Sequence, residues 1–128
     1  MLEFTQDTEL TATAINEERV NSRAASILVE GEHVIALYRP QKHANDQVIF
    51  TNRRIIYADP KDIANRKAEL SVLPYKEIRQ FTVETPGMGF SGDSKLHLIL
   101  LNGTTLDFNL HGTADIIEAA KAISEVIL

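Results

Sequence analysis

The sequence predicts a mainly β fold, a small barrel of about seven antiparallel strands capped by a C-terminal helix, plus an N-terminal helix. Three observations support this class. Short runs of β-branched and aromatic residues alternate with turn residues between positions 34 and 110. A stripe of apolar residues with helical spacing closes the chain. The length of 128 residues fits one domain that can bury a core of its own.

The first residues carry the weakest pattern. Residues 1–12 show no clear period, so a loose arm or a short docked segment is expected there. A helix is predicted from Asn16, because its side-chain oxygen can accept hydrogen bonds from the free N–H groups of a first turn. Gly31 is well placed to end this helix, since glycine tolerates the left-handed conformation that terminates helices.

The predicted N-terminal helix has an apolar stripe. Val20, Ala24 and Ile27 lie on one face at helical spacing. This stripe either covers the flank of the barrel or docks on a neighbouring subunit, and both possibilities remain open at this point. We therefore divide the chain into an N-terminal arm and helix, residues 1–29, and a barrel domain, residues 30–128.

The barrel strands follow in sequence with turn signals between them. The predicted strands are Val34–Tyr38, Gln47–Phe50, Ile55–Ala58, Glu69–Leu73, Arg79–Glu84, Lys95–Leu101 and Thr104–Leu110. Lys76 to Ile78 is expected to form a single helical turn. The pair Asn102-Gly103 is the strongest hairpin signal, because both residues readily adopt positive φ angles. These short strands suggest an antiparallel barrel or sandwich.

The chain ends in a predicted amphipathic helix. Thr113 can cap it, and Asp115 suits the positive end of its dipole. The apolar positions are Ile116, Ala120, Ile123 and Ile127. This side of the helix should pack on the sheet and plug its open end.

Two segments resemble the bacterial pleckstrin-homology (PH) domain family. The first is Ile49 to Ile56, with Thr-Asn-Arg-Arg at its centre, and the second is the Pro-Tyr-Lys turn within Leu73 to Ile78. The resemblance covers about residues 30–128. It implies a PH-like barrel of two nearly orthogonal sheets with a C-terminal helix, and it implies no catalysis. Because several members of this family assemble as ring-like homo-oligomers, it also implies self-association.

Composition excludes several classes of function. The formal net charge of −5 argues against a nucleic-acid partner and against strong adsorption to an anionic membrane. The absence of cysteine excludes disulfides, thiolate catalysis and thiolate-bound zinc. The acidic, polar start is unlike a signal peptide, and no apolar run is long enough to span a bilayer. A cytoplasmic location is therefore expected.

Neither a metal nor a cofactor is expected. The four histidines, His33, His43, His97 and His111, lack the spacing of metal ligands. Residues 87–92 match the pattern Gly-x-Gly-x-x-Gly. A dinucleotide-binding loop would be followed by a helix, whereas a strand follows here, so no dinucleotide site is predicted. No nucleophile elbow or phosphate-binding Lys loop is present, and the chain is not predicted to be an enzyme.

Four basic residues form the main candidate for ligand binding. Arg39, Lys42, Arg53 and Arg54 could together contact an anionic lipid or phosphate head group. The segment 47–50 between them carries no basic residue, which weakens this hypothesis. The alternative is that Arg53 and Arg54 serve the hairpin turn and the solvent.

A second candidate surface lies in the glycine-rich segment after position 85. Met88 and Phe90 are apolar residues that either mark a contact surface or fold back onto the barrel. These two residues and the N-terminal stripe lead to the first hypothesis, which is a non-catalytic domain that self-associates and binds protein partners. A module for an anionic head group is the alternative.

Overall fold

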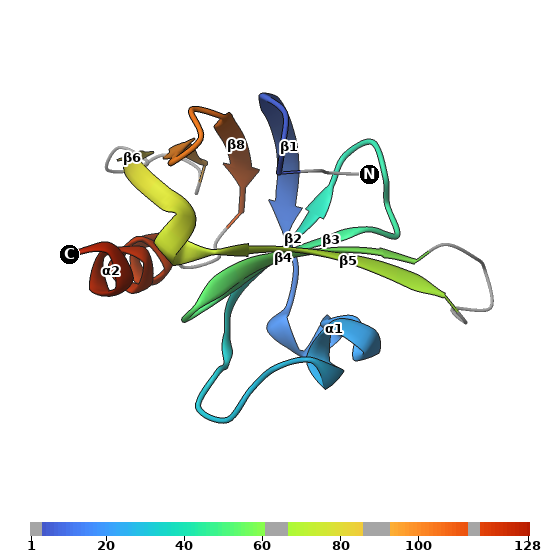
Figure 1. Ribbon diagram of the computed structural model, residues 1–128. Coiled ribbons are helices and arrows are strands. Elements are labelled where there is room, and N and C mark those ends of the chain that lie inside the picture. Colours follow the sequence, from blue (N-terminus) through green and yellow to red (C-terminus); the bar gives the residue numbers. More distant parts are fainter. Residues whose placement is uncertain (1–3, 61–66, 86–92, 113–115) are drawn as a thin grey trace.

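The computed structural model describes residues 4–60, 67–85, 93–112 and 116–128 (Figure 1). Within these residues the strands are β1 (Thr8–Ala14), β2 (Val34–Pro40), β3 (Gln47–Thr51), β4 (Arg54–Pro60), β5 (Ala68–Pro74), β6 (Ile78–Glu84), β7 (Ser94–Leu100) and β8 (Thr105–His111). The helices are α1 (Ser22–Ser26), α2 (Ile116–Ile127) and the 3-10 helices η1 (Glu17–Arg19) and η2 (Tyr75–Glu77).

The strands form one curled sheet with the order β5-β4-β3-β2-β1-β8-β7-β6. All neighbouring strands are antiparallel except β1 and β8, which are parallel. The sheet curves around α2 as a half-barrel. The predicted fold class, a mainly β barrel with a C-terminal helix, is confirmed. The expected all-antiparallel arrangement in two sheets is wrong, because the strands form one hydrogen-bonded sheet and β1 runs parallel to β8. The predicted hairpin at Asn102-Gly103 is also present, with Gly103 at a φ of 90°.

The strand that was not predicted is β1. Its residues Thr8 to Thr13 pair in parallel with β8, and its end pairs with β2, so it joins the two halves of the sheet. Of the two alternatives for this segment, the loose arm is therefore wrong from Thr8 onward, where the chain is docked as a strand. Leu10 packs against the core and Ala12 is fully buried, which gives the inward face of a strand. The signal was weak because Ala12 adds little hydrophobicity to the alternation.

The long helix predicted between Asn16 and Gly31 is also wrong. Asn16 does cap a first turn, since its Oδ1 accepts from the backbone N–H of Glu18 at 2.8 Å, but that turn is the short η1. The backbone is then extended, and a second helix begins after Asn21, whose side chain caps α1. The backbone N–H of Asn21 donates to the side-chain oxygen of Gln47 at 2.6 Å, and this bond to β3 holds the break in place.

The sheet has apolar side chains on both faces. The inner core lies between the sheet and α2, where Ile116, Ala119 and Ile123 are buried. Phe50 and Phe108 meet there edge to face, with ring centroids 5.8 Å apart. This arrangement agrees with the predicted apolar side of the C-terminal helix. Residues 113–115, which include the predicted cap, lie outside the described residues.

A second apolar cluster lies on the outer face of β2, β3 and β4. Its buried members are Ala24, Leu37, Ile49, Ile56 and Ala58. Partly buried Val20 and Ile27 pack against it from the segment around α1. The three residues of the predicted N-terminal stripe thus contact the sheet of their own chain. Figure 1 shows α1 below the layer that holds β3, β4 and β5.

Candidate functional site

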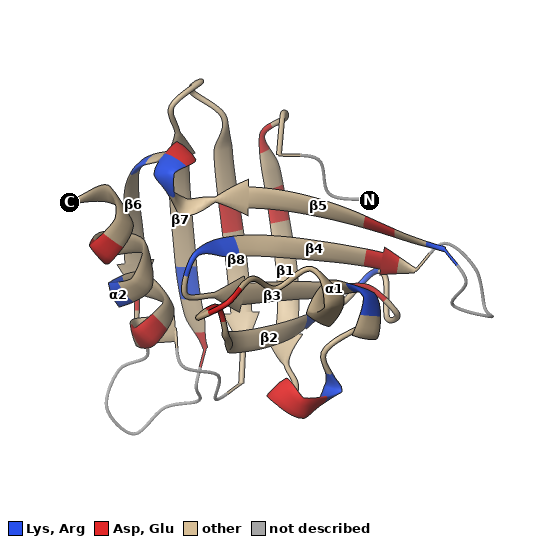
Figure 2. Ribbon diagram, turned by 60° about the horizontal axis from the view of Figure 1, so that its bottom comes forward, with Lys and Arg blue, Asp and Glu red and all other residues tan. Residues whose placement is uncertain are grey.

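The structure separates the four basic residues proposed for a head group. Arg39 lies near the end of β2 and Lys42 in the loop that follows, whereas Arg53 and Arg54 lie at the turn between β3 and β4. In the β2–β3 ladder, Val34 is opposite Thr51, so this turn lies at the start of β2. At about 3.3 Å per residue, five residues of strand place the two basic pairs roughly 17 Å apart. Figure 2 shows that basic and acidic residues are interspersed over the fold.

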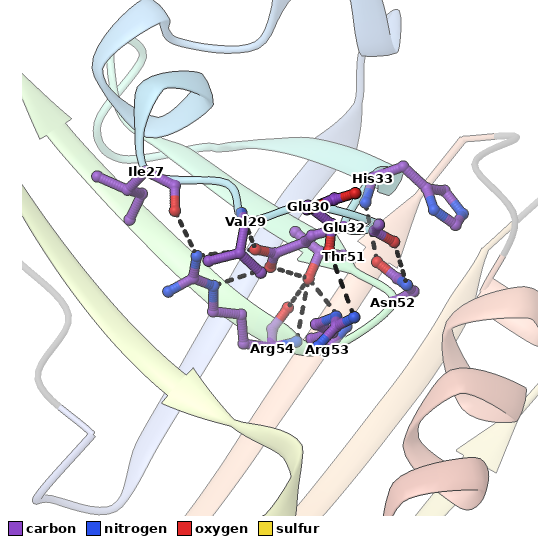
Figure 3. A network of polar contacts seen from close by, with 10 residues as sticks. Ile27, Val29, Glu30, Glu32, His33, Thr51, Asn52, Arg53 and Arg54 are labelled. Carbon is purple, nitrogen blue, oxygen red and sulfur yellow. Dashed lines mark hydrogen bonds and ion pairs between the residues drawn. The ribbon is translucent and has the colours of Figure 1, made fainter.

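Arg54 is engaged by a buried carboxylate (Figure 3). Its Nε and Nη2 donate to the two oxygens of Glu32, each at 2.8 Å, in the forked geometry that guanidinium and carboxylate groups prefer. The same Glu32 carboxylate accepts from the hydroxyl of Thr51 at 2.7 Å and from the backbone N–H of Val29 at 3.1 Å. The Glu32 side chain is 0% exposed and that of Arg54 is 20% exposed. The positive charge of Arg54 is therefore neutralised within the chain.

The environment of Glu32 also fixes its protonation. Burial alone would raise the pKa of Glu32, but the hydrogen bonds from Arg54, Thr51 and Val29 and the charge of Arg54 outweigh burial. The pKa of Glu32 therefore lies below its ordinary value, and the side chain is an anion at neutral pH.

The turn itself is held by its own side chains. The Thr51 hydroxyl oxygen accepts from the backbone N–H groups of Arg53 and Arg54, both at 3.0 Å. Asn52 bonds across to the segment before β2, where its Nδ2 donates to the Gly31 carbonyl and its Oδ1 accepts from the His33 N–H. Arg53 is exposed, and its guanidinium reaches the carbonyl oxygen of Glu30 at a long 3.5 Å. Of the two arginines, Arg54 thus makes the shorter and more numerous bonds to the loop before β2.

The Pro-Tyr-Lys turn contacts the same hairpin. The hydroxyl of Tyr75 donates to the carbonyl oxygen of Thr51 at 2.5 Å, and the Tyr75 backbone N–H donates to the Arg53 carbonyl at 3.1 Å. The Tyr75 side chain is fully buried, and burial together with the nearby charge of Glu32 raises the pKa of its hydroxyl. The two motifs that resemble the PH family therefore form a single contact, which we call the Thr51–Tyr75 lock.

Replacing Tyr75 by phenylalanine should weaken this lock without emptying the core. Losing the hydroxyl leaves the buried Thr51 carbonyl oxygen without this donor, so the free energy of unfolding should fall by about 1–3 kcal/mol. Urea denaturation would measure the change. Lys76→Ala, an exposed neighbour on η2, is the control and should stay near the wild type. If Tyr75→Phe has the same free energy of unfolding as the wild type, this hydrogen bond does not contribute to stability.

A polar surface that the sequence did not single out covers β7 and β8 on the outer face. His97 contacts Asp107 across the strands at 2.5 Å, and His111 contacts Asp93 at 3.0 Å. Beside the second pair is an open cleft of about 490 Å³. Its lining comes from the ends of β6, β7 and β8 and from Thr11 of β1. Along β7 and β8, outward positions that are mainly polar alternate with buried positions that are mainly apolar, and this alternation was the sequence signal for the surface.

The remaining sequence candidates have simpler positions. Met88, Phe90 and the glycine pattern of 87–92 lie outside the described residues. His33 and His43 are exposed. In the part of the chain that the structure describes, no three His, Asp or Glu side chains gather closely enough to hold a metal ion. No helix in that part is both long and apolar enough to cross a bilayer.

Comparison with known proteins identifies the family. The family model described as "Bacterial PH domain" matches residues 4–127. The chain belongs to the bacterial PH domain family. The match reaches well into the N-terminal region, which agrees with β1 being part of the sheet. The Thr51–Tyr75 lock therefore lies inside the bacterial PH domain of this chain.

Similar proteins share the fold, and the curated relatives are themselves uncharacterised. Protein YjqA of Bacillus subtilis is 38% identical over 87 residues, which is 68% of this chain and 66% of that protein. Protein YozO of the same organism is 32% identical over 100 residues, 78% of this chain and 82% of that protein. A DUF1696 family protein with a pleckstrin-homology domain from Shewanella loihica superposes with a TM-score of 0.63 at 27% identity, covering 92% of this chain and 98% of that chain. A PH domain from Shewanella amazonensis superposes with a TM-score of 0.53 at 26% identity, covering 89% of this chain and 90% of that chain.

Proposed function

We propose that this bacterial PH domain is a non-catalytic binding or scaffolding module that self-associates into a homo-oligomer and binds protein partners. The observation that carries the proposal is the open sheet. Within the described residues, β5 bonds only to β4 and β6 only to β7, so the sheet ends in two free edges. Free edge N–H and C=O groups accept a strand from another chain.

The two edges are unequal. β5 pairs with β4 over seven consecutive positions without irregularity, and Figure 2 shows it at the margin of its layer. Val72 near its middle is 37% exposed. β6 has an irregularity between Ile78 and Gln80 and carries the exposed charges Arg79 and Glu84, features that discourage strand addition. β5 is therefore the favoured edge for self-association.

The head-group alternative has less support from the geometry. Arg54 is neutralised by Glu32, and Arg39 and Lys42 lie at the far end of the hairpin from Arg53. This leaves no place among these four residues where their charges converge on one ligand.

Light scattering behind a sizing column, over a wide concentration range, tests the proposal. The wild type should run as an oligomer that persists on dilution. Val72→Lys places a charge on the free β5 edge and should shift the protein towards monomer, while Thr82→Lys on β6 is the matched control and should not. A wild type that is monomeric at every concentration would overturn self-association. An oligomer that resists Val72→Lys would instead rule out the β5 edge.

A further inference from the structure

The donors around Glu32 form a complete carboxylate site. Two N–H groups of Arg54, one hydroxyl and one backbone N–H converge on the two carboxylate oxygens, at 2.7 to 3.1 Å. Such a set satisfies both oxygens and matches the forked guanidinium geometry. The partial exposure of the Arg54 side chain, 20%, leaves a side of the site near solvent.

These donors are positioned by contacts other than Glu32. Nη2 of Arg54 also donates to the carbonyl oxygen of Ile27 at 2.8 Å. The Thr51 hydroxyl oxygen accepts hydrogen bonds from the backbone N–H groups of Arg53 and Arg54, which fix its position. The Thr51 carbonyl oxygen accepts a hydrogen bond from the Tyr75 hydroxyl. Removal of the Glu32 side chain therefore leaves most of the donor set in place, which is the condition for preorganised binding.

We propose that Arg54, Thr51 and the Val29 N–H are a small-carboxylate binding site whose ligand in the intact chain is Glu32. Glu32→Ala deletes Cγ, Cδ and the two carboxylate oxygens. Acetate consists of the same heavy atoms, a methyl carbon and a carboxylate, so it fits the space left behind. The site is self-occupied in the wild type, and of the two turn arginines only Arg53 is left to meet an external anion. This inference does not depend on self-association.

The test is chemical rescue of Glu32→Ala by acetate. Urea denaturation is measured at pH 7 in sodium acetate and in sodium chloride of equal ionic strength. The variant should lose stability in chloride, and its midpoint should rise with the logarithm of the acetate concentration once the site begins to fill. The wild type and Glu77→Ala, which removes an exposed carboxylate on η2, should show no acetate-specific gain.

Two further variants keep the test decisive. Glu32→Gln retains the bulk of the side chain and blocks the site, so acetate should not stabilise it. Glu32→Ala combined with Arg54→Ala should lose the response because the forked donor is gone. If Glu32→Ala is unfolded in chloride, circular dichroism should show folding as acetate is added. Acetate that is no better than chloride, in either the folded or the unfolded variant, would overturn the proposal.

Discussion

Arg54→Ala is expected to lower the free energy of unfolding by about 3–5 kcal/mol, the cost of leaving one member of a buried ion pair alone. The Glu32 side chain is completely buried and would keep only the Thr51 and Val29 donors. The loop before β2 would also lose its bond from Arg54 to the Ile27 carbonyl. Urea denaturation at pH 7 measures the loss.

Arg53→Ala is the matched control for this prediction. Arg53 lies in the same turn and carries the same charge, but it is exposed, so its removal should change stability by no more than about 0.5 kcal/mol. Similar losses for the two variants would contradict the role given to Arg54.

The pH dependence gives a second check on Arg54. The pKa of Glu32 is lowered in the folded state, so the pair contributes its full stability above the ordinary value of 4.5. This contribution is lost as the pH falls below that value through the lower pKa of the folded protein. The difference between wild type and Arg54→Ala should therefore be constant near neutral pH and should shrink in acid. A difference that grows in acid would refute the assignment.

Gly112→Ala is expected to destabilise the protein through two separate effects. Gly112 has a φ of 103°, where a side chain adds about 1–3 kcal/mol of backbone strain. A Cβ there would also lie 2.9 Å from the Cβ of Ala14, at the point where β8 leaves β1. This crowding should cost about 1–3 kcal/mol more. Thermal or urea unfolding would measure the sum.

Gly103→Ala separates the two effects. Gly103 has a similar φ of 90°, but no atom lies within 4 Å of the Cβ that would be added. It should therefore show the strain alone and lose less stability than Gly112→Ala. In addition, the double variant Gly112→Ala with Ala14→Gly should recover part of the lost stability, because it lacks the Ala14 Cβ that the new side chain would approach. Equal losses at the two glycines would mean that the contact with Ala14 is unimportant.

Much of the fold could be predicted because its signals are local. The strands β2 to β4 are short, nearly continuous apolar runs, and β7 and β8 alternate apolar with mainly polar residues. The last hairpin is marked by Asn102-Gly103, and the final helix has a clear apolar stripe. The missed elements depend on distant contacts instead. β1 is buried by its two neighbours although it carries only one large apolar residue, Leu10. The break before α1 depends on Gln47, which lies 26 residues beyond Asn21 in the chain.

The site shows the same division. The Thr-Asn-Arg-Arg and Pro-Tyr-Lys motifs were visible in the sequence, but no pattern showed that they touch. Glu32 precedes Arg54 by 22 residues and resembles an ordinary surface acid in sequence. Glu32 is buried because the loop before β2 folds over the turn, and only this arrangement lets Glu32 neutralise the charge of Arg54. The sequence suggested an anionic head group, or the turn and the solvent, as partners for Arg54, whereas in the structure its guanidinium binds the buried carboxylate of Glu32.

The place of β1 in the sheet has a consequence for synthesis on the ribosome. β1 forms six pairs with β8 and only three with β2, and the contact between Asp7 and Thr105 spans 98 residues. At a translation rate of about 5–20 residues per second, β8 is synthesised roughly 5–20 s after β1. Until β8 has been made, the side of β1 that pairs with it has no partner in the chain, and an unpaired strand edge can pair with a strand of another molecule.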